Sequence, residues 1–127
     1  MSTPKVLVVD DEPYMHALLQ HHLKRAGYEA LKAANGREAL ASAAQDQPAL
    51  IVMDIMMEEM DGLVALQELK KEPSTSSIPV IMITANAHNV TRQQAEESGA
   101  VLFLTKPFSP SQLIQEIQKL VPAGTAN

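Results

Sequence analysis

Five polar residues suited to metal and phosphoryl chemistry stand directly after short apolar runs of this 127-residue chain. They are Asp10, Asp11, Asp54, Thr84 and Lys106. Two or three carboxylates suit a hard octahedral cation such as Mg²⁺ or Mn²⁺, and a hydroxyl with an ammonium group suits a dianionic phosphoryl group. A metal, a lysine and a carboxylate nucleophile are what in-line phosphoryl transfer needs. Taken alone, Asp54 could equally be a helix-capping or turn residue, so its role depends on whether the fold brings the five together.

Alternating strand and helix patterns account for most of the chain. Short apolar runs rich in β-branched residues predict five strands, over Lys5–Val9, Tyr28–Ala33, Leu50–Met53, Val80–Ile83 and Val101–Leu104. Helical spacing predicts four helices, which begin near Pro13, Asn35, Asp61 and Ser109 and end by Gly27, Pro48, Pro73 and Val121. A further helix is expected over His88–Glu97, where only Val90 and Ala95 are clear core anchors. We expect it to be the least firmly packed helix.

This alternation predicts an α/β fold. Nearly continuous apolar strands indicate a parallel sheet covered on both faces by right-handed crossovers. In such a doubly wound sheet the carboxyl ends of all strands lie at one edge, which is where ligands bind. The five polar residues are therefore expected to meet at that edge, although they span positions 10 to 106.

Length, composition and charge exclude several classes of protein. A chain of 127 residues suits a single domain with a substantial core, and the absence of cysteine excludes disulfides and thiolate chemistry. The net charge of −5, with scattered Lys and Arg, argues against direct nucleic-acid binding, and an aromatic content of 3% provides no base-stacking platform. Neither a membrane-spanning run nor a secretory signal is present. We expect a soluble, cytoplasmic protein without a membrane partner.

Four motifs, in order, resemble the receiver domain of two-component response regulators. They are VVDDEP, DIMMEEMDG, MITA and LTKPF. Each motif is weak alone, but the four at the expected spacings are highly specific, and the resemblance runs from about Lys5 to Val121. It implies a receiver domain over residues 1–122 of the chemotaxis or stand-alone type, followed by a disordered tail over 123–127. The implied sheet is flavodoxin-like and five-stranded, with strand order 2-1-3-4-5 and five helices.

By this resemblance Asp54 would be the phosphoacceptor, attacking the phosphorus of a kinase phosphohistidine to form an acyl phosphate. Asp11 would bind Mg²⁺ directly and Asp10 largely through water. Asp54 and the backbone carbonyl of Met56 would complete the protein ligands, and Mn²⁺ could replace Mg²⁺. Such a chain is a signalling domain rather than an enzyme, although it catalyses its own phosphoryl transfer and dephosphorylation.

The resemblance also implies a conformational switch. Lys106 would pair with a phosphoryl oxygen ahead of a cis peptide to Pro107, and Thr84 would close its hydroxyl onto the phosphoryl group. The vacated space would let Phe103 rotate inward. The fourth helix, fifth strand and fifth helix are expected to form the signalling face, because a conformational change on phosphorylation should be largest where packing is loose.

The implied partners are proteins. The phosphoryl donor would be a histidine kinase or a histidine phosphotransfer protein, and the receiver of the signal would be a downstream protein target or an output domain. The chain would be a monomer or would dimerise on phosphorylation.

Two positions depart from the family pattern. Glu58 and Glu59 stand where Pro-Gly is usual, and we expect them to be solvated loop charges. Phe103 lacks a hydroxyl, so its two states would differ in packing but not through a phenolic hydrogen bond. Met56 and Asn86 lie at positions that tune the phosphoryl lifetime in the family.

Three other functions share parts of this pattern. An FMN-binding flavodoxin-like module would need a hydroxyl-rich loop after the first strand, and aromatic residues around the ring, where this chain has Asp10–Pro13 and few aromatics. A small Mg²⁺-dependent phosphatase with an Asp nucleophile would carry a second carboxylate two residues later, where this chain has Met56. A pseudo-receiver would lack an acid or the lysine, and here none is missing.

Several conspicuous residues have simpler explanations. Asp10 and Asp11 alone could cap a helix. The histidines are interpreted as surface or core-edge residues: His16, His21, His22 and His88. The methionines are interpreted as gap-filling packing: Met53, Met56, Met57, Met60 and Met82.

Overall fold

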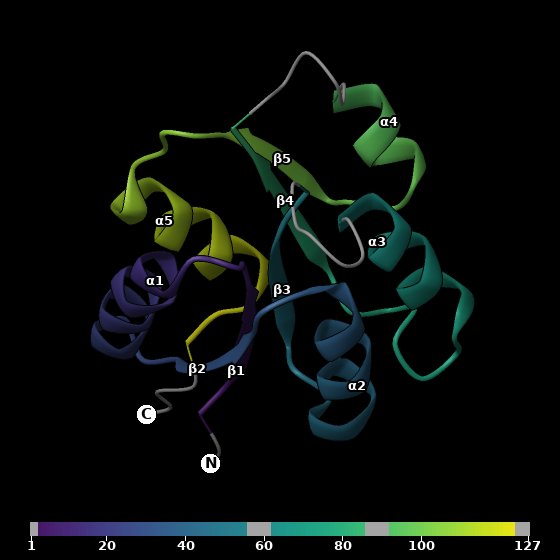
Figure 1. Cartoon of the computed structure of the whole chain (residues 1–127). Helices are drawn as coiled ribbons and strands as arrows, with labels where there is room; N and C mark the ends of the chain where they lie inside the picture. Colours follow the sequence, from purple (N-terminus) through teal and green to yellow (C-terminus); the bar gives the residue numbers. More distant parts are fainter. Residues whose placement is uncertain (1–2, 56–61, 86–91, 124–127) are drawn as a thin grey trace.

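A computed structural model describes residues 3–55, 62–85 and 92–123 of the chain. Within these ranges five strands alternate with five helices, as predicted (Figure 1). The strands are β1 Lys5–Val9, β2 Glu29–Ala33, β3 Leu50–Asp54, β4 Val80–Thr84 and β5 Leu102–Thr105. The helices are α1 Pro13–Arg25, α2 Gly36–Asp46, α3 Gly62–Lys71, α4 Arg92–Glu97 and α5 Pro110–Leu120. None of these helices is long and apolar enough to span a membrane.

Some of the expected features fall outside the described residues. These are Met56, Met57, Glu58, Glu59, Met60, Asp61, Asn86, His88 and Val90.

The five strands form one parallel sheet in the order β2-β1-β3-β4-β5, which confirms the predicted order. β1 and β3 are neighbours in the middle, and Val9 pairs with Met53. Asp54 pairs with Ile83 on β4, and Thr84 pairs with Thr105 on β5. This register places the ends of the strands side by side at the carboxyl edge.

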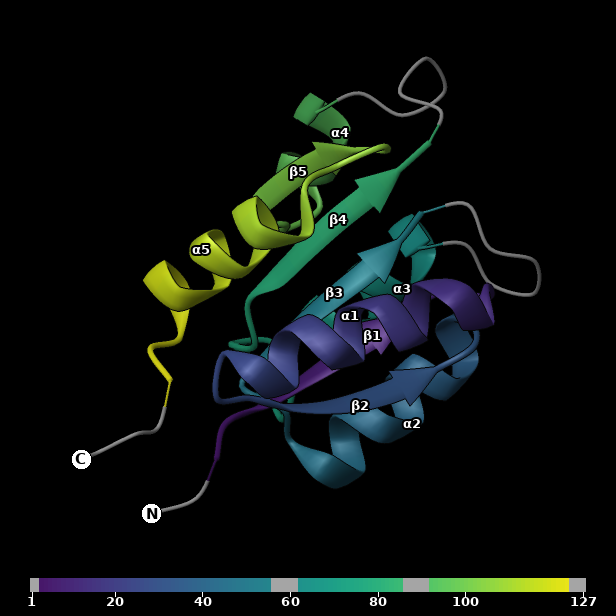
Figure 2. The same cartoon turned by 90° about the vertical axis from the view of Figure 1, so that its left-hand side faces the viewer.

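Helices cover both faces of the sheet. Figures 1 and 2 show α1 and α5 on one face and α2, α3 and α4 on the other. Successive side chains of a strand point to opposite faces, so Val6 and Val8 pack with α1 and α5, whereas Leu7 and Val9 join the core under α2, α3 and α4. The strands are thus buried on both sides, as a doubly wound parallel sheet requires.

Local signals in the sequence explain most of the helix starts. Pro13 and Pro110 occupy first-turn positions, where a missing N–H has no cost. The Asn35 side chain accepts a hydrogen bond from the Glu38 N–H at 2.9 Å and caps α2. The Ser109 hydroxyl accepts from the Gln112 N–H at 3.3 Å and caps α5.

Several strand boundaries differ from the prediction by one residue: β2 and β5 begin one residue later, and β3, β4 and β5 end one residue later, at Asp54, Thr84 and Thr105. β2 begins at Glu29 and not at Tyr28. The Tyr28 ring is buried in the core, and its hydroxyl donates to the Val121 carbonyl. β5 begins at Leu102, and Val101 is 48% exposed. Apolar character alone extends both runs by one residue, because it does not distinguish a ladder residue from the turn that precedes it.

Gly62 lies where the start of α3 passes very close to the end of β3. Its N–H donates to the Ile55 carbonyl at 2.9 Å. A Cβ atom at this position would lie 2.4 Å from the Asp54 carbonyl oxygen and 2.8 Å from the Ile55 Cα. Only glycine allows this approach between the two backbones.

Candidate functional site

The carboxyl edge of the sheet brings the predicted polar residues together. Asp54 ends β3 and Thr84 ends β4, while Asp10 follows β1 directly. All three are buried, with exposed fractions of 6%, 0% and 3% respectively. Buried carboxylates need compensating partners, so the contacts around them indicate what the site is built to hold.

Lys106 is the cation at the centre of this site. Its Nζ lies 3.0 Å from Asp54 Oδ2 and 3.3 Å from Asp10 Oδ2. It also lies 3.6 Å from Glu12 Oε1, which is largely exposed. The Lys106 N–H donates to the Thr84 carbonyl at 2.8 Å, which fixes this residue just beyond the end of β5. One ammonium group therefore bridges carboxylates from two separate strand ends.

Burial and charge act in opposite directions on Lys106. Burial alone would lower the pKa of the ammonium, but hydrogen bonds and charge from Asp54 and Asp10 outweigh it and raise the pKa above its ordinary value. Lys106 therefore remains protonated at neutral pH. It is placed to neutralise negative charge at the Asp54 carboxylate.

The acidic residues form a cluster that fits a divalent cation. Asp10, Asp11 and Asp54 each offer a carboxylate oxygen, and the three oxygens lie within 4.8 Å of one another. Three carboxylates, those of Asp10, Glu12 and Asp54, share the one ammonium group, and Asp11 adds a fourth acid, so the described cluster carries excess negative charge. Hard carboxylate oxygens are the ligands that Mg²⁺ and Mn²⁺ prefer. The donor set thus fits the predicted metal, whereas the predicted Met56 ligand lies outside the described residues.

Phe103 is buried in this structure rather than turned outward. It is 3% exposed and packs in the core under α2, α3 and α4. The Arg92 guanidinium carbon at the start of α4 lies 5.5 Å from the centroid of its ring, a cation–π distance. The Lys106–Pro107 peptide is cis, as the resemblance implied.

Two residues of the site were not singled out from the sequence. Glu12 lies within the VVDDEP motif and was given no role there, but it contacts Lys106. His16 was interpreted as a surface or core-edge histidine, but its Nε2 donates to the Asp10 carbonyl at 2.6 Å. One signal could have identified it, because His16 shares the helical stripe of Leu19 and Leu23, the buried residues of α1.

Replacing Lys106 by Met is expected to lower the free energy of unfolding by about 2 kcal/mol at neutral pH without Mg²⁺, because Asp10 and Asp54 would lose their buried cation. Folding raises the pKa of Lys106. Its stabilising contribution is therefore fully present below the unfolded-state pKa of about 10.4 and is lost as the pH rises through the folded-state pKa. The difference in stability between wild type and variant should accordingly shrink above about pH 10.4.

Urea unfolding of both proteins across the neutral and alkaline range measures this difference. Lys119→Met is the matched control, because the Lys119 side chain is 71% exposed and its only ion pair with a described residue is that with Glu116, at 3.3 Å. The control should change stability by less than about 0.5 kcal/mol. A Lys106→Met protein as stable as the wild type at neutral pH would contradict the pairing argument.

Together, the fold and the site define a class: a flavodoxin-like α/β domain with an acidic crevice and a bridging lysine at the carboxyl edge of its sheet. Comparison with known proteins then identifies the family. The chain belongs to the response regulator receiver domain family, which it matches over residues 6–118.

Known relatives support this assignment. The chain is 43% identical over 117 residues to the probable transcriptional regulator ycf27 of Cyanophora paradoxa, covering 92% of this chain and 48% of that protein. It is 36% identical over 118 residues to the DNA-binding dual master transcriptional regulator RpaA of Synechocystis, covering 93% of this chain and 49% of that protein. The chain thus spans about half the length of the curated relatives it matches.

Solved structures share the whole fold. The chemotaxis protein CheY4 of Vibrio cholerae has a TM-score of 0.86 and 32% identity, over 94% of this chain and 100% of that one. The receiver domain of a sensor histidine kinase from Pseudomonas aeruginosa has a TM-score of 0.84 and 28% identity, over 94% and 98% of the two chains. That structure holds a magnesium ion coordinated in its active site cleft.

Proposed function

We propose that this receiver domain is a phosphoacceptor switch in which Asp54 takes a phosphoryl group from a phosphohistidine in a Mg²⁺-dependent reaction. The observation that carries the proposal is the contact between Lys106 Nζ and Asp54 Oδ2 at 3.0 Å, inside a cluster of three carboxylates. This arrangement combines a nucleophile, a cation and a metal-binding group of oxygens, which are the parts that in-line phosphoryl transfer needs.

Asp10, Asp11 and Asp54 are the described residues that would hold Mg²⁺, and Mn²⁺ suits the same oxygens. When bound, the ion would neutralise negative charge on the phosphoryl oxygens. The magnesium ion in the related kinase receiver supports this choice of metal. The backbone carbonyl of Met56 is proposed as a further ligand.

The transfer itself is a displacement at phosphorus. A carboxylate oxygen of Asp54 forms the new P–O bond as the P–N bond to the donor imidazole breaks, and the electron pair leaves with the imidazole nitrogen. Lys106 stabilises the charge that builds up on the phosphoryl oxygens, because its ammonium group already lies beside Asp54. The Thr84 hydroxyl, at the end of the neighbouring strand, is the group proposed to bond the phosphoryl product.

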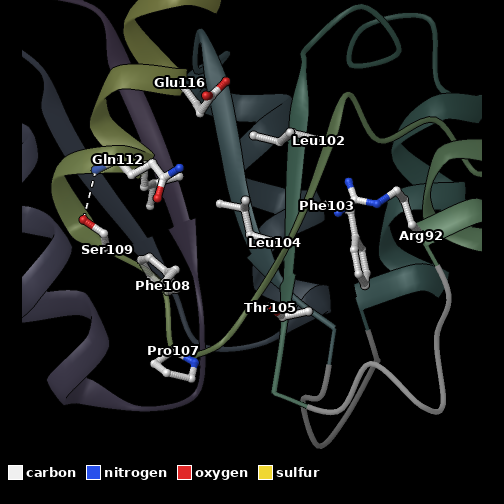
Figure 3. A pocket seen from close by; sticks show the side chains of 11 residues that line it. Arg92, Leu102, Phe103, Leu104, Thr105, Pro107, Phe108, Ser109, Gln112 and Glu116 are labelled. Carbon is white, nitrogen blue, oxygen red and sulfur yellow. Dashed lines mark hydrogen bonds between the residues drawn. The ribbon is translucent and has the colours of Figure 1, made fainter.

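The donor is proposed to be a histidine kinase or a histidine phosphotransfer protein. The readout is proposed to involve α4, β5 and α5. A groove of about 310 Å³ runs over this region and is lined by residues that include Arg92, Phe103, Phe108 and Glu116 (Figure 3). Figure 3 shows Phe103 on the α4 side of β5 and Leu104 on the α5 side.

Within this region, α4 is weakly anchored. Of the six residues of α4 only Ala95 is buried, so little apolar contact holds the helix against the sheet. A phosphoryl group that drew Thr84 toward Asp54 would change the packing around Phe103, because Thr84 ends the strand that pairs with β5. The movement would then reach Arg92, which covers the ring of Phe103.

Amide exchange tests this signalling face. Binding of a phosphoryl mimic such as beryllofluoride, with Mg²⁺, is expected to change exchange rates over α4, β5 and the start of α5. Exchange in the last turns of α2, at the opposite edge of the sheet, is expected to stay the same and serves as the internal control. An unchanged α4–β5–α5 region in a protein that has bound the mimic would contradict the proposed readout.

The phosphoacceptor proposal is tested by intact mass. The chain is incubated with a small phosphodonor and Mg²⁺, and we expect the gain of one phosphoryl group, which peptide mapping places on Asp54. The modification should be lost in hydroxylamine, because an acyl phosphate is attacked by this nucleophile whereas a phosphoserine or phosphothreonine is not. A wild-type chain that gains no phosphoryl mass would overturn the proposed function.

A further inference from the structure

Asp10 is held at each of its polar groups. Its N–H donates to the Ala33 carbonyl at 3.1 Å. Its carboxylate accepts from the Glu12 N–H at 2.9 Å and from Lys106 Nζ at 3.3 Å. Its carbonyl oxygen accepts from His16 Nε2 at 2.6 Å. Two of these four contacts come from side chains, those of Lys106 and His16. Lys106 has a role in the proposed phosphoryl transfer, whereas His16 has none.

The carbonyl of Asp10 determines the backbone orientation of Asp11, just beyond the end of β1. The Asp10 carbonyl and the Asp11 N–H belong to one planar peptide unit, so a bond that holds the carbonyl also sets the orientation of the Asp11 backbone. The Asp11 side chain is exposed, and no hydrogen bond or ion pair to the described residues holds it. The placement of its carboxylate therefore depends on the backbone of this turn.

His16 is built to make this one bond. Its Nε2 must carry the proton, because the backbone oxygen opposite can only accept. Its Nδ1 is buried and has no hydrogen-bond partner among the described residues. His16 is partly buried and lies on the stripe of α1 that carries Leu19 and Leu23 into the core, so the helix turns its ring toward the sheet. The contact with Asp10 is thus the single polar interaction that this ring makes with the described residues.

We propose that His16 is a positioning residue for the metal-binding acids, holding the turn between β1 and α1 so that the carboxylates of Asp10 and Asp11 point to one cation. The inference rests on the proposed function, because it assigns a role toward the proposed metal site. Residues that orient metal ligands typically change metal affinity by about tenfold or more when they are replaced.

The test uses Mn²⁺ binding to the full chain, followed by the electron paramagnetic resonance signal of the free ion. His16→Ala is expected to raise the Kd for Mn²⁺ about tenfold. His16→Gln, whose amide can donate to the same carbonyl, is expected to restore most of the affinity. His21→Ala is the matched control, because this exposed histidine of the same helix contacts His22 and not Asp10, and it should bind Mn²⁺ as the wild type does.

Two further measurements separate a positioning role from a structural one. Amide exchange of Glu12, whose N–H is bonded to the Asp10 carboxylate, should be faster in metal-free His16→Ala than in the metal-free wild type, and urea unfolding shows whether the whole fold has been weakened. A loss of stability with an unchanged Kd for Mn²⁺ would overturn the proposal, as would a His16→Gln protein no better than His16→Ala. A wild-type chain that binds no Mn²⁺ would overturn the metal site itself, and with it the role of His16 toward that site.

Discussion

An Asp54→Asn variant is expected to gain no phosphoryl group from a phosphodonor that modifies the wild-type chain. The amide of Asn has no carboxylate oxygen to attack phosphorus. The other described carboxylates of the cluster do not take the position that Asp54 has beside Lys106, so we expect none of them to replace it as the acceptor. Asp10 is tied to the Glu12 N–H as well as to Lys106, whereas Asp54 makes the shortest ion pair of this lysine, at 3.0 Å. Intact mass after incubation with Mg²⁺ and the phosphodonor measures the result.

This loss should not come from unfolding. Asn can still accept a hydrogen bond from Lys106, and the change removes one negative charge from a cluster that has an excess of them. We therefore expect the free energy of unfolding to change by less than about 1 kcal/mol. Asp46→Asn, at the far end of α2, is the matched control and should be phosphorylated like the wild type. A phosphoryl group on Asp54→Asn would show that another residue is the acceptor.

Gly62→Ala is expected to destabilise the fold strongly, because the added methyl group would meet backbone atoms beside the site. The new Cβ would lie 2.4 Å from the Asp54 carbonyl oxygen and 2.8 Å from the Ile55 Cα. Both contacts are with backbone, so a side-chain rotation cannot relieve them, and α3 must move away from β3. We expect a loss of about 3 kcal/mol in the free energy of unfolding.

Urea unfolding measures this loss, and Mn²⁺ binding should weaken in parallel because the clash involves the backbone of Asp54 itself. Val64→Ala provides the comparison on the same helix. Val64 is 44% exposed, and its truncation should change stability by about 0.5 kcal/mol or less. If Gly62→Ala unfolds at the same urea concentration as the wild type, then the close approach of α3 to β3 is wrong.

Much of the fold could be predicted because burial on two faces leaves a strong pattern. Strands such as Leu50–Asp54 must be apolar at every position before the end, and helices such as Pro110–Leu120 must keep a single apolar stripe. The site follows from the fold, because parallel strands place Asp10, Asp54 and Thr84 at one edge. The position of each residue relative to its strand is therefore enough to predict which residues meet at the site.

Contacts that depend on side-chain direction were harder to predict. The hydrogen bond from His16 to the Asp10 carbonyl depends on how α1 rotates over the sheet, and the helical stripe indicates only the approximate face. The stacking of Arg92 on Phe103 joins residues eleven positions apart on different elements, and no local pattern predicts it. Strand ends were uncertain by one residue because a turn such as that at Val101 can be as apolar as the strand it precedes.

The order of the strands has one further consequence. Asp10 follows β1 and Asp54 ends the neighbouring strand β3, but the chain leaves β1 for α1 on one face of the sheet and α3 covers the other face. The carboxylates at these two strand ends therefore stand between the two helical layers, at the edge where both layers meet the sheet.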